Sequence, residues 1–356
     1  MLCLLFLVGS ALSQQLTGNQ NQLLVVVQDG KYGFIDHKGN IVIRPQFSWA
    51  EDFWDDYGEV YVCGRYVSID STGALFPLRF AEKDQLEPKH KNNKVGFIDS
   101  SGTFKISPIF DDALPFSEGL AAVKIDYKWG FIDTSGRQVI PPRFSLAFYF
   151  EDGVGVVESD SSYLLIDTSG KVLASGFDLA DPIADGRVPV RVREKAGYLD
   201  LRGKVVIPLI YDSVNGFSSG LAAVEKNDKW GYIDKDGKVV IPFEFDSAGY
   251  FASGLAPAKS GSTRGFINKT GQFSFYLPFE YSPGFLAGNV ETDISRFWTD
   301  DNKFGYVNTS GQVVWGPLDE SPDHPPLIGW SEKDKANSCE GIPAALKVKI
   351  ADFPSD

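Results

Sequence analysis

The sequence predicts an all-β protein, a tandem array of about nine three-stranded antiparallel units of ~34 residues each. Three observations carry this prediction. One segment returns at a nearly fixed spacing, short β-rich runs alternate with turn residues, and no run sustains helical periodicity. A period this short and regular indicates repeated supersecondary units in place of a single globular core.

The repeat is clearest in residues 128–133, which return almost unchanged as residues 229–234. Weaker copies fill the chain, and their central positions are Gly33, Val67, Gly96, Gly130, Leu164, Gly197, Gly231, Gly265 and Gly305. The successive differences between these positions are 34, 29, 34, 34, 33, 34, 34 and 40. This spacing predicts a repeat array over residues 23–317.

One unit, residues 119–152, contains three short β-rich runs that are separated by polar residues and ended by Pro141-Pro142. Runs of this length and spacing predict an antiparallel meander. Phe131 and Ile132 are neighbours in one strand, so both faces of the small sheet are apolar. Such a sheet must be covered on both faces, and the adjacent units are the available cover.

A pair with the spacing Asp-x-x-Gly or Asn-x-x-Gly separates the second and third runs of every unit. The pairs are Asp36/Gly39, Asp70/Gly73, Asp99/Gly102, Asp133/Gly136, Asp167/Gly170, Asp200/Gly203, Asp234/Gly237, Asn268/Gly271 and Asn308/Gly311. Asp or Asn favours the first position of a type I turn, and the later Gly can take a positive φ, so the pair predicts a tight hairpin. Calcium is the competing interpretation, but most loops supply one acidic residue and two supply only an amide. We therefore expect neither a metal nor a cofactor.

Two further features concern packing between units. A glycine inside a strand signals a close approach, and we expect an aromatic ring of the neighbouring unit to lie over Gly130. The connection after each proline begins with an aromatic residue and ends with aromatic-x-x-Gly. The aromatic pairs are Phe110/Phe116, Tyr211/Phe217, Phe245/Phe251 and Phe279/Phe285. We expect these rings to attach the crossovers to the core.

Stacked units of this kind form either an open superhelical array or a propeller-like ring. Nine units exceed the usual range of ~4–8 propeller blades, which slightly favours the open form.

These motifs resemble the WG-containing repeat family, also called KWG repeats, which occurs in tandem in many bacterial proteins. The resemblance rests on residues 128–133 and 229–234 and on the Val-Ile-Pro ends at 139–141 and 240–242. It implies a β-rich array and brings no catalytic residues. The structural repeat positions that it marks are Trp129, Gly130, Asp133, Gly136, Trp230, Gly231, Asp234 and Gly237. The units around Val67 and Leu164 depart from the pattern, as does the longer loop before Gly305.

The ends of the chain lie outside the repeat. Residues 1–13 form an apolar segment of signal-peptide size with no preceding Lys or Arg, residues 14–22 a polar linker, and residues 318–356 an irregular tail or cap. The first segment is too short to span a bilayer, and no other run is a candidate span. We expect export to the periplasm, cell surface or exterior. Cys63 and Cys339 would then remain, and the sequence leaves open whether they pair.

Composition bears on the class of partner. The chain is 43% hydrophobic and 13% aromatic, which is enough for extensive burial, and it carries a net charge of −13. An acidic surface repels phosphate backbones, so we expect no nucleic-acid partner.

The sequence shows no catalytic constellation. Its three histidines, His37, His90 and His324, lie in a hairpin loop, in a charged insert at residues 81–93 that we expect to be a surface loop, and in the tail. Trp49, Trp54 and Trp298 lie off the repeat position and are the candidate binding residues, because aromatic faces suit sugar or peptide platforms. The favoured alternative is that they fill space in the crossovers.

The predicted function is therefore that of a non-enzymatic binding or scaffold module, exported by a bacterium, with a protein, peptide or glycan as partner. The alternative is a hydrolase or carbohydrate-active protein with its site at the axis of a closed ring. That alternative rests on fold analogy alone.

Overall fold

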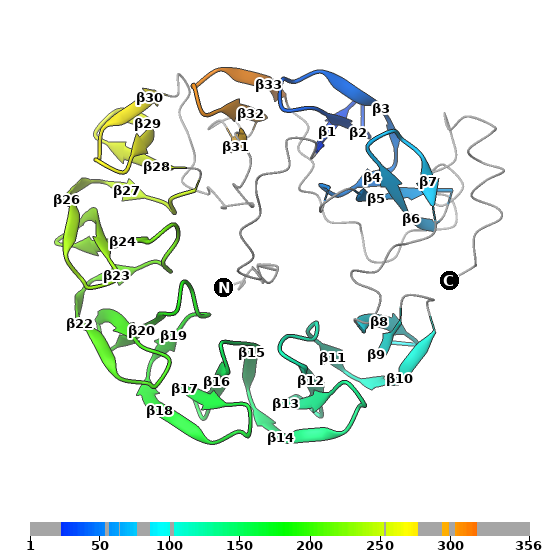
Figure 1. Cartoon of the computed structure of the whole chain (residues 1–356), viewed down its shortest axis with the longest axis vertical. Coiled ribbons are helices and arrows are strands. Elements are labelled where there is room, and N and C mark those ends of the chain that lie inside the picture. The colour runs from blue at the N-terminus through cyan, green and yellow to red at the C-terminus, as the bar shows by residue number, and fades with distance from the viewer. Residues whose placement is uncertain are drawn as a thin grey trace.

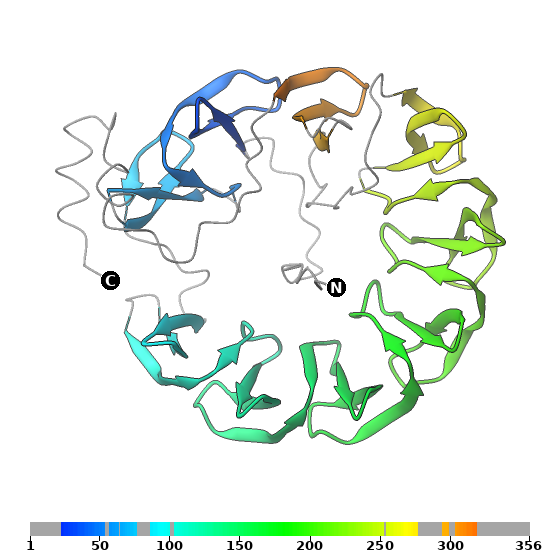
Figure 2. The same ribbon diagram turned by 180° about the vertical axis from the view of Figure 1, so that it is seen from behind.

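The computed structural model describes residues 23–53, 57–63, 65–76, 86–99, 103–252, 254–276, 294–298 and 303–318. Within these ranges every regular element is a β-strand, and the strands form nine small antiparallel sheets. The sheets follow one another around a closed ring (Figures 1 and 2), so the protein is a nine-bladed β-propeller. The all-β prediction is confirmed, and no described helix is long and apolar enough to cross a membrane.

Each blade is a run of consecutive strands. Blades 1 to 3 contain β1 (Leu24–Gln28), β2 (Lys31–Ile35) and β3 (Ile41–Phe47); β4 (Trp49–Ala50), β5 (Tyr57–Val62), β6 (Arg65–Asp70) and β7 (Leu75–Phe76); and β8 (Glu87–Lys91), β9 (Lys94–Ile98) and β10 (Phe104–Phe110). Blades 4 to 6 contain β11 (Asp112–Ala113), β12 (Leu120–Ile125), β13 (Lys128–Asp133) and β14 (Gln138–Phe144); β15 (Leu146–Glu151), β16 (Val154–Ser159), β17 (Ser162–Asp167) and β18 (Val172–Phe177); and β19 (Leu179–Ala180), β20 (Val188–Val192), β21 (Lys195–Leu199) and β22 (Val205–Tyr211). Blades 7 to 9 contain β23 (Ser213–Val214), β24 (Leu221–Lys226), β25 (Lys229–Asp234) and β26 (Val239–Phe245); β27 (Ser247–Ala248), β28 (Leu255–Ser260), β29 (Thr263–Asn268) and β30 (Phe273–Tyr276); and β31 (Ile294–Trp298), β32 (Phe304–Asn308) and β33 (Val313–Leu318).

Most blades have a fourth strand that the three-stranded prediction did not include. In blade 4 this is β11, where Asp112 pairs with Lys124 and Ala113 with Val123. The predicted crossover therefore becomes an inner strand, because its backbone polar groups are satisfied by pairing with the next repeat. The charged insert also differs from its prediction as a loop, since residues 87–91 form β8 and pair with β9.

The Asp-x-x-Gly hairpin is confirmed. The Oδ1 atom of Asp133 accepts hydrogen bonds from the backbone N–H groups of Ser135 and Arg137, both at 3.0 Å, and Gly136 has φ +82°. The Ser135 hydroxyl, followed by the side chain and backbone of Arg137, lowers the pKa of Asp133 to about 2. The repeated aspartate is thus a turn residue whose carboxylate is already occupied by local donors.

The glycine of the Trp-Gly pair is explained by a different contact from the one expected. A Cβ at Gly130 would lie 2.5 Å from the carbonyl oxygen of Ile140 and 2.6 Å from the nitrogen of Pro142. The space is occupied by the bulged backbone of β14 in the same blade, not by an aromatic ring of the next unit. The expectation of a ring over Gly130 is therefore wrong, because the bulge between β13 and β14 brings the backbone of the outer strand against the glycine.

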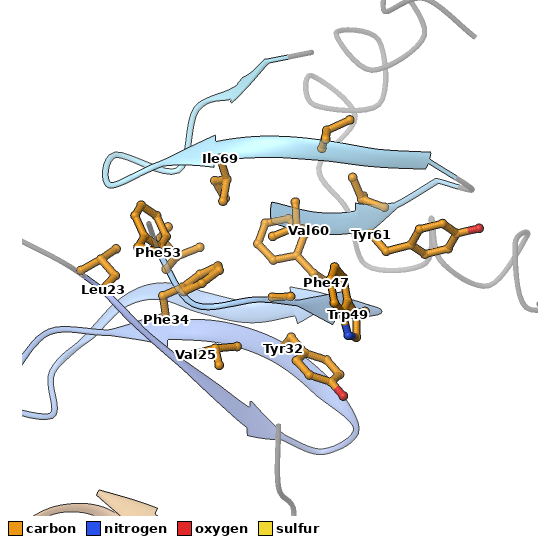
Figure 3. Packing of buried hydrophobic residues seen from close by; sticks show 14 of the residues in the cluster. Leu23, Val25, Tyr32, Phe34, Phe47, Trp49, Phe53, Val60, Tyr61 and Ile69 are labelled. Atoms are coloured by element: carbon orange, nitrogen blue, oxygen red, sulfur yellow. The ribbon is translucent and has the colours of Figure 1, made fainter. Parts of the chain in front are cut away.

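Apolar side chains join neighbouring blades. Phe131 of blade 4 and Phe150 of blade 5 are both fully buried, and their ring centroids lie 4.8 Å apart. The same pairing recurs as Phe34–Phe53, Phe97–Phe116, Tyr198–Phe217 and Tyr232–Phe251, at 4.8–5.0 Å. Figure 3 shows this packing between blades 1 and 2. The crossover aromatics in the described residues thus attach each crossover to the preceding blade, as predicted; Phe279 and Phe285 lie outside those residues.

The ring closes where blade 9 meets blade 1. Leu24, Val26 and Ile35 form one hydrophobic cluster with Phe304 and Tyr306. The Tyr306 hydroxyl donates to the carbonyl oxygen of Val25 at 2.9 Å, and Arg296 pairs with Asp52. The slight preference for an open array was wrong, because the apolar faces at the two ends cover each other and no end remains exposed. The sheets of blades 9 and 1 stay separate, so side chains make the closure.

Candidate functional site

The residues at the repeat positions have structural roles within the blades. Trp129 is 6% exposed, and the ammonium of Lys124 lies 5.6 Å from its ring centroid, while Trp230 is half-buried. Their glycines admit the outer strand, and their aspartates form the turns. These residues stabilise the fold of each repeat, so a binding surface must be formed by other residues.

Of the three tryptophans proposed as a binding platform, the structure describes the side chain of Trp49 alone. Trp49 is 6% exposed and packs edge-on against Tyr66 at 5.4 Å in the core between blades 1 and 2 (Figure 3). Trp54 lies outside the described residues, and Trp298 belongs to β31 but its side chain is not described. The structure therefore places one of the three side chains, and it places that one inside the fold.

The inner strands end in two-residue hairpins that were not predicted from the sequence. Glu118 and Gly119 both have positive φ, at 50° and 78°, and Ser117 and Leu120 on either side pair with each other. This is a two-residue hairpin of the type that favours Gly at its second position. Equivalent residues with positive φ are Asp152-Gly153, Asp185-Gly186 and Ser219-Gly220. The signal for these hairpins was present in the sequence as acid-Gly and Ser-Gly dipeptides.

These hairpins lie on the same end of each blade as the Asp-x-x-Gly turns, because Leu120 pairs with Asp133. We call this side of the ring the turn face. The side with the two-residue hairpins after the first long strand, such as Asp126-Tyr127, is the opposite face. Strands β11 and β15 run along the inner side of the ring in Figure 1, so their hairpins surround the axis on the turn face.

Hydrogen bonds connect successive hairpins around the rim. The backbone N–H of Gly153 donates to Glu118 Oε2 at 2.8 Å, and that of Gly220 donates to Asp185 Oδ2 at 3.1 Å. The Ser117 hydroxyl donates to the carbonyl oxygen of Phe150 at 2.6 Å. Each hairpin is therefore held by its neighbour, which makes the rim a preorganised surface.

Four carboxylates from three successive blades gather on this rim: Glu118, Glu151, Asp152 and Asp185. We call them the rim acids. Glu151 is half-buried and the other three are exposed. Burial, followed by the charges of Asp152, Glu118 and Asp185, raises the pKa of Glu151 to about 7. One ammonium, that of Lys235, lies 3.7 Å from Asp185. The rim acids thus form an excess of negative charge suited to Lys or Arg side chains.

Within the residues that the structure describes, no group of three or more His, Cys, Asp or Glu side chains is arranged to hold a metal ion. His37 lies in a turn and His90 in β8, while His324 falls outside the described ranges.

The pKa shifts predict a stability maximum at mildly acidic pH. Glu59 and Glu151 have pKa values of about 7, above their ordinary 4.5, so each binds its proton more tightly when folded. Stability should then rise as pH falls from 8 through 7 toward 4.5. Asp133, with its pKa lowered from 3.8, acts in the reverse sense and contributes stability that is lost below about pH 4. Thermal unfolding should show the highest Tm near pH 5.

The double variant E59Q/E151Q tests this assignment. It should remove most of the gain in Tm between pH 8 and pH 5, whereas E194Q on the opposite face should keep it. An unchanged gain in the double variant would show that other groups set the pH dependence.

Comparison with known proteins supports the repeat assignment. The family described as "WG containing repeat" matches residues 32–62, 96–129, 129–163, 197–230 and 230–262. No curated protein sequence matches the chain. Among solved structures, the chain is similar to one titled as the eukaryotic initiation factor, with 12% identity, a TM-score of 0.55 and coverage of 82% of this chain and 94% of that one. At this identity the similarity concerns the fold alone.

Weaker similarities extend to other solved structures. The dihydro-heme d1 dehydrogenase NirN gives a TM-score of 0.43 at 14% identity, covering 83% of this chain and 72% of that one. BamB from Moraxella catarrhalis gives 0.32 at 10% identity, covering 83% and 93%.

Proposed function

Because the chain belongs to the WG-containing repeat family and closes into a nine-bladed ring, we propose that it is a non-enzymatic binding or scaffold protein. The observation that carries the proposal is the set of rim acids on hydrogen-bonded hairpins of the turn face. The partner is a protein or peptide with a segment rich in Lys or Arg.

Electrostatics supports this choice of partner. Glu151 is partly removed from water and surrounded by Asp152, Glu118 and Asp185, so its charged form is disfavoured in the free protein. A bound cation would relieve that repulsion, and the net charge of −13 would speed the approach of a basic partner. The hairpins need no reordering on binding, which keeps the entropic cost low.

We also propose that the protein is exported. Cys63 is disulfide-bonded, and structural disulfides are typical of oxidising compartments. Residues 1–13, which suggest a signal peptide by composition, lie outside the described residues. Fractionation of cells that produce the natural gene product should recover it outside the cytoplasm. Recovery from the cytoplasm in reduced form would refute export.

Binding can be tested with a labelled (Lys-Ala)-repeat peptide and a (Glu-Ala)-repeat peptide of equal length, followed by fluorescence anisotropy. We expect the basic peptide alone to bind, and added salt to weaken its binding. The variant E118Q/E151Q/D152N/D185N should lose about tenfold or more in affinity, because four charges near the contact are removed.

The matched control is D126N/D160N/E194Q/D228N, which removes the same charge from hairpins of blades 4 to 7 on the opposite face. It should bind the basic peptide nearly as well as the wild type. Equal loss in both variants would show that net charge, and not the rim, attracts the peptide.

One observation favours the alternative of a hydrolase. Glu151, with a pKa of about 7 beside other carboxylates, has the protonation behaviour of a general acid. Hydrolysis of polysaccharide or peptide substrates by the full chain, abolished in E151Q, would establish this alternative and displace the binding role.

A further inference from the structure

The joint between blades 6 and 7 has a carboxylate at its inner end. Asp181 follows the inner strand β19, and its backbone N–H donates to the carbonyl oxygen of Pro189 at 3.0 Å. The equivalent residue of blade 4 is Leu114, whose N–H donates to the carbonyl oxygen of Ala122 at 2.9 Å. The Leu114 side chain packs against the hydrophobic cluster between blades 4 and 5. Blade 6 thus has an acid at a position where blade 4 uses an apolar side chain to fill the joint.

The Asp181 carboxylate makes no hydrogen bond or ion pair with the residues that the structure describes, although it is partly buried. Burial raises the pKa of Asp181, and the charge of the exposed Arg191 lowers it. A carboxylate that is partly removed from water and receives no donor costs stability. A ligand that brings a positive charge and an N–H donor would offset this cost.

Tyr250 of blade 8 reaches the same place. An added Cβ at Gly216 of blade 7 would lie 3.8 Å from Tyr250 Cε1 and 2.9 Å from the Cβ of Ala184 in blade 6. Burial raises the pKa of Tyr250, a hydrogen bond from the Gly216 backbone lowers it, and the charge of Asp181 raises it. The Tyr250 side chain remains 38% exposed. Residues that follow the inner strands β19, β23 and β27 (Figure 1) therefore lie together on the inner wall of the ring.

This part of the inner wall is continuous with the rim acids. Asp181 precedes the rim acid Asp185 by four residues, at the start of the segment that leads into the hairpin of blade 6. Blade 5 has a second tyrosine beside a carboxylate, since burial, followed by the charge of the rim acid Glu151, raises the pKa of Tyr149. A basic segment on the rim can therefore extend a side chain to Asp181 and Tyr250.

We propose that one Lys or Arg side chain of the basic partner binds to the Asp181 carboxylate and the Tyr250 ring. This inference rests on the proposed function, and it adds that the basic segment enters the mouth of the ring from the rim. The negative face of a tyrosine ring attracts a cation, and partial removal from water strengthens the attraction. The cation also donates the charge-assisted hydrogen bond that Asp181 lacks in the free protein.

The first test measures the affinity of the labelled (Lys-Ala)-repeat peptide for D181N and Y250A. Each variant should lose about tenfold, and Y250F, which keeps the ring, should bind more tightly than Y250A. The loss in D181N should persist at about 0.5 M salt, because a partly buried pair is screened less than an exposed one.

The matched controls are E194Q and Y127A, which make similar changes on the opposite face and should bind the peptide like the wild type. A basic peptide that fails to bind the wild-type chain would refute the proposed function and this inference with it. If the rim variant E118Q/E151Q/D152N/D185N lost binding while D181N and Y250A kept it, this inference alone would be refuted.

The second test is the thermal unfolding of D181L, which needs no peptide. Leucine is the residue that blade 4 has at this position, so the Tm should rise by about 2–4 °C while the peptide affinity falls. The reverse exchange, L114D in blade 4, should lower the Tm. A lower Tm in D181L would show that the carboxylate stabilises the joint, and it would overturn the binding role.

Discussion

Alanine in place of Gly130 is expected to lower the free energy of unfolding by about 3 kcal/mol or more. The added Cβ would lie 2.5 Å from the carbonyl oxygen of Ile140 and 2.6 Å from the nitrogen of Pro142, both parts of a backbone. Backbone atoms cannot turn away as a flexible side chain can, so β14 must separate from β13 or the blade must unfold. Denaturant unfolding followed by fluorescence measures the loss.

Gly119→Ala is the control in the same blade. Gly119 has φ +78° and nothing within 4 Å of an added Cβ, so alanine there meets only the backbone penalty of about 1–2 kcal/mol. If both variants lost the same stability, the close approach of the outer strand would not be the reason for the glycine.

Phe131→Ala should be the most damaging truncation at a joint between blades, with a loss of about 3–5 kcal/mol. The ring is 0% exposed, and its centroid lies 4.8 Å from the ring centroid of Phe150 in the next blade. Its removal leaves a cavity that crosses the boundary between blades 4 and 5. Since each blade contacts only its neighbours, hydrogen exchange should accelerate mainly in these two blades.

Tyr127→Ala provides the matching surface control, because that ring is 86% exposed on the opposite face. It should change the free energy of unfolding by less than about 0.5 kcal/mol. A uniform acceleration of exchange around the whole ring in Phe131→Ala would contradict the view that the blades are held pair by pair.

The local structure of each blade could be predicted from short-range chemistry. Asp133 and Gly136 interact with residues two to four positions away, so their spacing alone specifies the hairpin. The alternation of Phe131 and Ile132 likewise predicted two apolar faces, and both residues are buried against different neighbours.

Features that depend on pairing between repeats were less accessible. The inner strand β11 exists because Ala113 finds a partner in Val123, and the hairpin at Glu118-Gly119 follows from that pairing. The charged segment at Glu87–Lys91 has the composition of a loop, yet it forms β8 because β9 provides a regular pairing partner. The composition of this segment correctly indicated polar side chains, but the loop conformation that it predicted for the backbone was wrong.

The amino-acid sequence alone determined the repeat, its turns and the need for each sheet to be covered on two sides, since these depend on contacts between residues close in the chain. Tertiary structure alone decided that the array closes, where Val25 meets Tyr306. It also decided that the rim acids of three blades lie close enough to interact electrostatically. Closure depends on the small angle between successive blades summed over nine units, and no local pattern encodes that sum.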